Sequence, residues 1–246
     1  MRSTRGRARI GALVPFTNTN LEPDLALLAP AGVSVHVARL GGYDAEEIPD
    51  TEQMAGLGAA DMDEPLRLLA GVRPDVVLYG CTSATLAHGT AFDRELAAKV
   101  ERAMGAPTVT AAGALVAALD RLSARRIAFA SPYVEALNDA AIAFLADQSI
   151  TTIARADIDA TLDNEGQGAL TPAEVMELAR KACAAAYRQL DALVLSCTDM
   201  RSVEAIDDLE RELGIPVVSS NQALMRSALD VLGLPPHCPG FGQLLA

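Results

Sequence analysis

The sequence predicts an α/β fold built from two pseudo-symmetric halves, each a parallel sheet flanked by helices. Three observations support this prediction. Short apolar runs alternate with longer amphipathic segments, which is typical of parallel sheets covered by helices. Landmark residues recur in the same order about 117 positions apart. Hydrophobic residues make up 50% of the 246 positions, which is enough to build a full core.

Six apolar runs predict buried strands, and four amphipathic segments between them predict helices. The last two helices have clear boundary signals: Thr171 and Pro172 suit a helix start, and Gly214 suits a helix end. The expected strands are 9–16, 74–81, 106–113, 125–133, 191–197 and 215–220. The expected helices are 90–104, 134–148, 171–190 and 201–214.

The duplication is carried by paired landmarks. Ile10 and Ile127 begin strands that reach Pro15 and Pro132, and each pair lies 117 positions apart. The strands that end at Cys81-Thr82 and Cys197-Thr198 are offset by 116 positions. After each cysteine come a helix, a Gly-x-Pro sequence, a Val-rich strand and a helix that has Ala-Leu near its start. We therefore expect a first half of residues 1–113 with 222–246, and a second half of residues 114–221.

Composition and charge exclude several classes of protein. The chain has 32 acidic and 20 basic residues, a formal net charge of −12, so neither nucleic acid nor an anionic membrane is an expected partner. Four cysteines without a Cys-x-x-Cys pair, and three scattered histidines, do not predict a metal site. No apolar run approaches the roughly 18 residues of a membrane span, and no signal-peptide core is present. We expect a soluble cytoplasmic protein.

Cys81 and Cys197 are the candidate catalytic residues. Each comes after a predicted strand and precedes a helix, whose N-terminal N–H groups stabilise a thiolate. Ligands of parallel sheets collect beyond the carboxyl ends of the strands, so the two thiols are expected to face each other across the cleft between the halves. An isolated cysteine is more often a packing residue. We assign that role to Cys183, and we expect no catalytic role for Cys238 in the terminal loop.

Polar residues near these cysteines are candidates for binding a carboxylate. The hydroxyl groups of Thr82, Ser83 and Thr198, with nearby backbone N–H groups, can hold an anion without a basic side chain, although helix capping is the simpler role. Asn18 lies just after the first strand and offers an amide, but it also suits a turn. Tyr133 occupies the corresponding place in the second half, and its phenol can donate to a carboxylate oxygen.

Five segments resemble the aspartate/glutamate racemase superfamily, and within it the maleate cis-trans isomerase and arylmalonate decarboxylase branch. They are "VPFTNTNLEP" (14–23), "GCTSAT" (80–85), "SPYVEALN" (131–138), "DNEGQGAL" (163–170) and "SCTDMR" (196–201). The resemblance implies two flavodoxin-like halves with the active site between them, no metal, no organic cofactor, a small carboxylate substrate, and a homodimer or homotetramer. It also implies that Asn164, in a segment that otherwise suits a loop, and Pro15 bind substrate.

We expect a cis-trans isomerase that converts an enedioate such as maleate to its trans isomer, with Cys81 as nucleophile and Cys197 as proton donor. One alternative uses the same two cysteines as bases that racemise an amino or hydroxy acid. A decarboxylase is a further alternative, but arylmalonate decarboxylases have Gly in place of Cys81. A carboxylate sensor without catalytic activity would have no need of two facing thiols.

Overall fold

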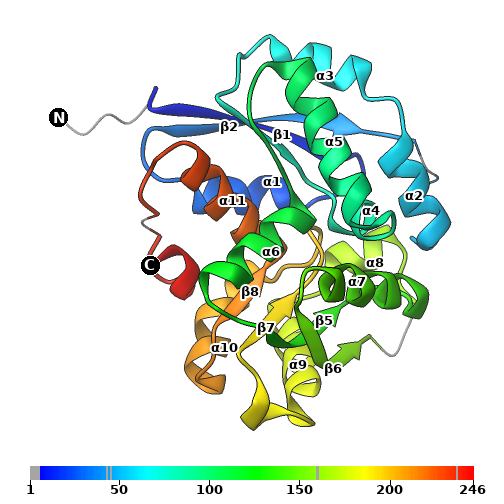
Figure 1. Cartoon of the computed structure of the whole chain (residues 1–246), viewed down its shortest axis with the longest axis vertical. Coiled ribbons are helices and arrows are strands. Elements are labelled where there is room, and N and C mark those ends of the chain that lie inside the picture. Colours follow the sequence, from blue (N-terminus) through cyan, green and yellow to red (C-terminus); the bar gives the residue numbers. More distant parts are fainter. Residues whose placement is uncertain (1–5, 43, 45, 159–160, 237) are drawn as a thin grey trace.

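The computed structural model describes residues 6–42, 44, 46–158, 161–236 and 238–246 (Figure 1). These residues form two four-stranded parallel sheets with helices packed against them. The strand order is β2-β1-β3-β4 in the first sheet and β6-β5-β7-β8 in the second. The two orders are equivalent, which confirms the predicted α/β fold of two similar halves.

The elements of the first sheet and its helices come first along the chain. They are β1 (Ala8–Pro15), α1 (Leu21–Leu28), β2 (Val33–Leu40), α2 (Thr51–Ala59), α3 (Asp63–Ala70), β3 (Val76–Tyr79), α4 (Thr82–Leu86), α5 (Gly89–Met104), β4 (Thr108–Thr110) and α6 (Ala111–Arg121). The remaining elements are β5 (Arg126–Ser131), α7 (Glu135–Asp147), β6 (Thr151–Asp157), α8 (Asn164–Ala169), α9 (Pro172–Ala184), η1 (Tyr187–Gln189), β7 (Ala192–Leu195), η2 (Val203–Ala205), α10 (Ile206–Leu213), β8 (Val217–Ser219), α11 (Ser220–Val231) and η3 (Gln243–Leu245).

Every predicted strand and helix has a counterpart in the structure, but two strands were not predicted. β2 and β6 are edge strands, and most of their residues are only partly buried, so neither contains a continuous apolar run. The predicted strand 106–113 is wrong in its last residues, because Thr110 ends β4 and caps α6. Its hydroxyl accepts a hydrogen bond from the N–H of Gly113 at 3.0 Å.

The duplication extends to individual hydrogen bonds. The carboxylate of Asp75 accepts from the backbone N–H of Arg9 at 2.8 Å, and that of Asp191 accepts from Arg126 at 2.8 Å. Each contact fastens the start of a central strand to its neighbour in the sheet. The matching helices α5 and α10 both end at a glycine in the left-handed conformation, with φ of 64° at Gly105 and 63° at Gly214.

Helices α6 and α11 join the two halves. They pack against each other, and each contacts strands of both sheets, α6 through β4 and β8, and α11 through β3, β4 and β8. In Figure 1 they lie between the first sheet in the upper part of the view and the second sheet below. Their buried faces supply Leu115, Leu119, Leu224 and Leu229 to a hydrophobic core that also contains residues of both sheets.

A buried polar contact fixes α11 to α1. Asn221 donates one hydrogen bond to the carboxylate of Asp24 at 2.7 Å and another to the carbonyl oxygen of Thr198 at 3.0 Å. Burial raises the pKa of Asp24 from 3.8 to about 7, although the bond from Asn221 opposes this shift. Asp24 is therefore protonated in the folded protein over a pH range in which the unfolded chain is ionised.

We expect Gly105→Ala and Gly214→Ala each to lower the free energy of unfolding by about 1 kcal/mol, because the left-handed conformation disfavours any Cβ. No atom lies within 4 Å of an added Cβ at either position, so the cost is conformational rather than steric. Urea unfolding provides the measurement. Gly56→Ala in α2 is the matched control: it also adds a Cβ to open space, but in an ordinary helical conformation, and it is expected to stabilise. A stabilising effect at Gly105 or Gly214 would contradict this account.

We expect the wild-type protein to lose stability as the pH rises from about 4 to about 7, and Asp24→Asn to lack that component. The folded state holds a proton on Asp24 that the unfolded chain releases above its ordinary pKa of 3.8. The contribution of Asp24 to the free energy of unfolding therefore decreases up to about pH 7 and is then constant. The rise of about three units in the pKa of Asp24 corresponds to a change in the free energy of unfolding on the order of 4 kcal/mol. Urea unfolding at several pH values measures it, with Asp147→Asn on the exposed end of α7 as control. Equal pH dependence in wild type and Asp24→Asn would rule it out.

Candidate active site

Cys81 and Cys197 line one small cavity at the carboxyl ends of the strands. Cys81 lies two residues after β3, at the N-cap of α4, and Cys197 lies two residues after β7. The cavity has a volume of about 30 Å³. It is lined by Pro15, Thr17, Asn18, Pro49, Met54, Cys81, Ser83, Asn164, Gln167, Cys197, Thr198 and Asp199. The structure thus brings together seven of the nine residues that the sequence analysis proposed.

The two thiols are buried, and burial is the main reason that the pKa of each lies above its usual value of 9.0. For Cys81, hydrogen bonds from the Ser83 hydroxyl and from the N–H groups of Ala84 and Ser83 oppose the rise in pKa. For Cys197, the neighbouring Asp199 carboxylate raises the pKa further. No lysine, arginine or histidine is among the described residues lining the cavity, so hydrogen-bond donors alone must stabilise negative charge.

The backbone after each cysteine has a different conformation in the two halves. The helix α4 starts directly after Cys81, as predicted. A turn comes after Cys197, and helical structure begins only at Val203 with η2. The predicted helix 201–214 corresponds to η2 and α10, which begin six residues after Cys197, so no helix N-terminus directly follows this cysteine. One backbone N–H in this turn, that of Asp199, points at the Cys197 sulfur at 3.3 Å.

Thr198 connects the two halves at the cavity. Its hydroxyl donates to the carbonyl oxygen of Gly80, next to Cys81, at 3.0 Å and accepts from the amide of Asn18 at 3.1 Å. The amide oxygen of Asn18 accepts from the N–H groups of Asn20 at 3.1 Å and of Leu21, the first residue of α1, at 2.9 Å. Asn18 is therefore both a cavity residue and a turn residue, which combines the two roles that its position suggested.

Asp199 fastens the turn after Cys197 to the segment after β1. One oxygen of its carboxylate accepts from the N–H groups of Thr19 at 2.8 Å and Asn20 at 3.1 Å, and from the side-chain amide of Asn20 at 3.0 Å. Burial raises the pKa of Asp199, and these hydrogen bonds oppose the rise. The same Asn20 amide donates to the carbonyl oxygen of Gly168 in α8 at 3.0 Å, so three segments meet here.

Thr82 and Tyr133 do not line the cavity, although both lie next to it. The hydroxyl of Thr82 donates to Ser220 at the start of α11, at 3.0 Å, which joins the two halves a second time. Tyr133 is buried, and its pKa is raised well above 10.0, first by burial and then by its closeness to Cys197. A hydrogen bond from its phenol lowers the pKa of Cys197, against the larger effect of burial. Tyr133 is thus placed to support a negative charge on that sulfur.

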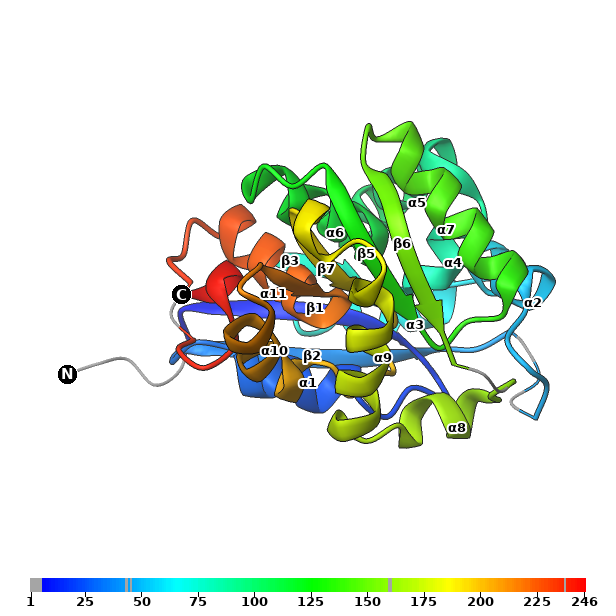
Figure 2. The same ribbon diagram turned by 90° about the horizontal axis from the view of Figure 1, so that it is seen from below.

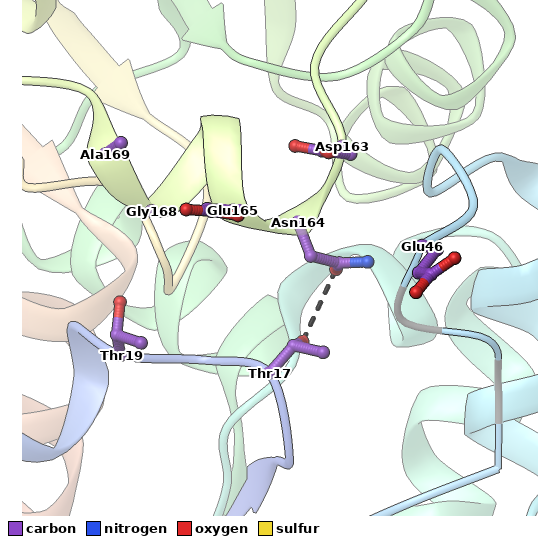
Figure 3. A pocket seen from close by; sticks show the side chains of 8 residues that line it. All are labelled: Thr17, Thr19, Glu46, Asp163, Asn164, Glu165, Gly168 and Ala169. Atoms are coloured by element: carbon purple, nitrogen blue, oxygen red, sulfur yellow. Dashed lines mark hydrogen bonds between the residues drawn. The ribbon is translucent and has the colours of Figure 1, made fainter.

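Asn164 is the first residue of a short helix, so the expectation of a loop at 163–170 is wrong. The carboxylate of Asp163 caps α8 by accepting from the N–H of Gly166 at 2.8 Å. In Figure 2, α8 lies at the edge of the molecule beyond the end of β6. The side chain of Thr17 donates to that of Asn164 at 3.4 Å, and Figure 3 shows the two pointing toward each other.

A larger pocket of about 540 Å³ lies on the outer side of this contact (Figure 3). Thr17 and Asn164 line both it and the inner cavity, so the pair stands between the cysteines and the outer space. The outer pocket also contains the carboxylates of Glu46, Asp163 and Glu165. Its lining is completed by Thr19, Gly168 and Ala169.

Sequence reasoning missed five residues of the inner cavity: Thr17, Pro49, Met54, Gln167 and Asp199. Thr17, Gln167 and Asp199 lie inside the segments that carry the family resemblance, so their position along the chain was an available signal. Pro49 precedes α2 and Met54 lies in it, and nothing in this part of the sequence indicates a site.

Two further features concern metals and membranes. In the part of the chain that the structure describes, no group of three or more His, Cys, Asp or Glu side chains is arranged to hold a metal ion. Within the same residues, no helix has both the length and the apolar character required to cross a membrane.

Comparison with known proteins identifies the family. The family model for arylmalonate decarboxylase matches residues 12–245. The maleate isomerase of Nocardia farcinica is 31% identical over 249 aligned positions, which cover 98% of this chain and 96% of that protein. The arylmalonate decarboxylase of Bordetella bronchiseptica is 31% identical over 236 positions, covering 94% and 91%.

Solved structures agree with these matches. A Cys-to-Ser variant of the Nocardia farcinica maleate cis-trans isomerase, with a covalently bound succinylcysteine intermediate, superposes with a TM-score of 0.88 at 31% identity, over 97% of this chain and 98% of that one. A Cys-to-Ala variant of the Pseudomonas putida maleate isomerase with maleate gives 0.87 at 26% identity, over 97% of both chains. An arylmalonate decarboxylase gives 0.77 at 28% identity, over 96% and 98%. The chain therefore belongs to the arylmalonate decarboxylase family, as its five motifs predicted.

Proposed function

We propose that this protein is a cofactor-independent cis-trans isomerase that converts maleate to fumarate. The observation that carries the proposal is the pair of buried sulfurs, Cys81 and Cys197, on one cavity surrounded by hydrogen-bond donors. A substrate held there has one thiol available to form a bond with carbon and a second to supply a proton. Maleate isomerases aligned over almost the whole chain support this choice of substrate.

The reaction proceeds by reversible addition across the double bond. The Cys81 thiolate forms a C–S bond with one alkene carbon, and the electron pair of the double bond moves to the other carbon and its carboxylate. Cys197 gives that carbon the proton of its thiol. The product is a succinyl thioether, the kind of intermediate seen in the Nocardia farcinica variant. Rotation about the new single bond then brings the carboxylates to opposite sides.

The second half of the reaction reverses the first. The Cys197 thiolate takes the proton back, the double bond re-forms in the trans geometry, and the C–S bond breaks with its electron pair returning to Cys81. No atom is gained or lost, and both thiols end as they began. The charge that develops on the substrate is carried by donors around the cavity, for which we propose Asn18, Ser83 and Asn164 and the backbone N–H groups beside Cys81. We propose that Thr198, whose hydroxyl proton is donated to Gly80, binds the substrate indirectly by holding Asn18 in place, with Tyr133 and Thr82 supporting the site. Pro15 contributes to the wall.

The assignment of Cys81 as nucleophile rests on its hydrogen bonds. The Ser83 hydroxyl lies 3.6 Å from its sulfur, and two backbone N–H groups also favour its thiolate. The Cys197 sulfur also accepts from the Asp199 N–H and from the Tyr133 phenol, and the Asp199 carboxylate raises the pKa of both thiols. The Cys197 thiol in addition donates to an amide oxygen, which favours its protonated form.

Cys81→Ser and Cys197→Ser are each expected to lower the rate of fumarate formation by about a thousandfold or more, because each removes a group that acts only in the reaction. Proton NMR of the reduced protein with maleate measures this rate, and circular dichroism verifies the fold of each variant. Cys238→Ser, outside the cavity, is the control and should be fully active. Fumarate formation by Cys81→Ser at close to the wild-type rate would refute the mechanism.

If wild-type protein leaves maleate unchanged, the racemase alternative is tested next. Deuterium appearing at Cα of aspartate or a hydroxy acid in deuterated buffer would then favour racemisation at the same two thiols.

A further inference from the structure

Gln167 is buried in the cavity and contacts the sulfur of Cys197. It is the one residue of α8 whose side chain is almost fully enclosed, with 6% of its surface exposed. The thiol of Cys197 donates to its side-chain oxygen across 3.8 Å. An amide oxygen can only accept hydrogen bonds, so this contact exists only while the sulfur keeps its proton.

The orientation of this amide is fixed by its other end. The Nε2 group of Gln167 donates to the carbonyl oxygen of Leu162 at 3.3 Å, and an amide turned the other way would place two oxygens together there. The oxygen is therefore directed toward Cys197. The helix that carries it is held in place by the Asp163 cap and by the contact of Asn20 with Gly168.

Close approach of α8 to the site depends on Gly168. An added Cβ at this glycine would lie 3.0 Å from the Thr19 hydroxyl and 3.1 Å from the Asp199 carboxylate. A glycine at position 168 therefore lets α8, and with it the neighbouring Gln167, lie this close to the site. Both sulfurs accept hydrogen bonds, Cys81 from a hydroxyl and two N–H groups and Cys197 from the Asp199 N–H, but the contact with an amide oxygen is made by Cys197.

We propose that Gln167 holds Cys197 in its thiol form and thereby makes it the proton donor, which leaves Cys81 as the nucleophile. A residue of α8 then adds to the contrast between the cysteines' own turns in setting the division of work between two cysteines from related halves. This role rests on the proposed isomerase function, but the effect of Gln167 on Cys197 can be measured without any substrate.

The test compares Gln167→Met and Gln167→Glu in a Cys81→Ser background. The rate at which iodoacetamide alkylates Cys197 is measured by mass spectrometry of its peptide at about pH 8 to 10, where the rate reports the thiolate fraction. Methionine is similar in length but has no acceptor oxygen, so alkylation should be roughly three- to tenfold faster than with Gln167. The carboxylate introduced by Gln167→Glu should slow it, because a second negative charge beside the sulfur opposes ionisation.

Gln148→Met is the control: it makes the same substitution in the same background, at the end of α7, and should leave the alkylation of Cys197 unchanged. Circular dichroism verifies that each variant is folded. Alkylation of Cys197 that is no faster in Gln167→Met than with Gln167 present would overturn the proposal. If wild-type protein still converts maleate in that case, the isomerase assignment stands and only the role of Gln167 fails. If wild-type protein does not convert maleate, faster alkylation in Gln167→Met would still establish the effect on Cys197.

Discussion

The hydroxyl of Thr198 is the contact on which the geometry of the site depends. It donates to Gly80, beside Cys81, and accepts from Asn18, so one side chain from the second half fixes two segments of the first. The bond from Thr82 to Ser220 makes a second connection. Both are buried, where an unpaired polar group is costly, so these bonds strongly favour one relative placement of the halves. The distance between the two sulfurs is set by that placement.

A cavity without a basic side chain imposes a particular chemistry. A cation beside the sulfurs would stabilise thiolate on both cysteines and would bind carboxylates tightly before and after reaction. Oriented N–H and O–H groups instead discriminate by direction, since they stabilise charge only at the atoms they face. The raised pKa values of both thiols are the consequence of this dry environment. Such an arrangement favours the neutral form of both thiols at rest and makes the donors available to the charge that forms in the reaction.

The sequence was informative where the two halves repeat each other and where a segment is fully buried. The paired strand ends revealed Cys81 and Cys197, and the position after the first strand revealed Asn18. Edge strands β2 and β6 escaped prediction, because half-exposed strands lack continuous apolar runs. The helix at Asn164 was missed because six residues rich in glycine have weak helix propensity, and the Asp163 cap outweighs it. Gln167 and Asp199 lie inside the segments that carry the family resemblance, but their contacts with Cys197, Thr19 and Asn20 join different segments and are not visible in a local pattern.

Helices α6 and α11 each contact strands of both sheets, and this has a consequence for how the chain folds. Helix α11 covers α1 and the strands of the first sheet, yet it ends only at Val231. The N-terminal half therefore cannot acquire its complete core as an independent unit while the rest is being synthesised. Asn18 and Thr198, which must meet to form the site, are 180 positions apart. Contacts of such long range are slow to form, and the two thiols can meet only after both halves have been synthesised.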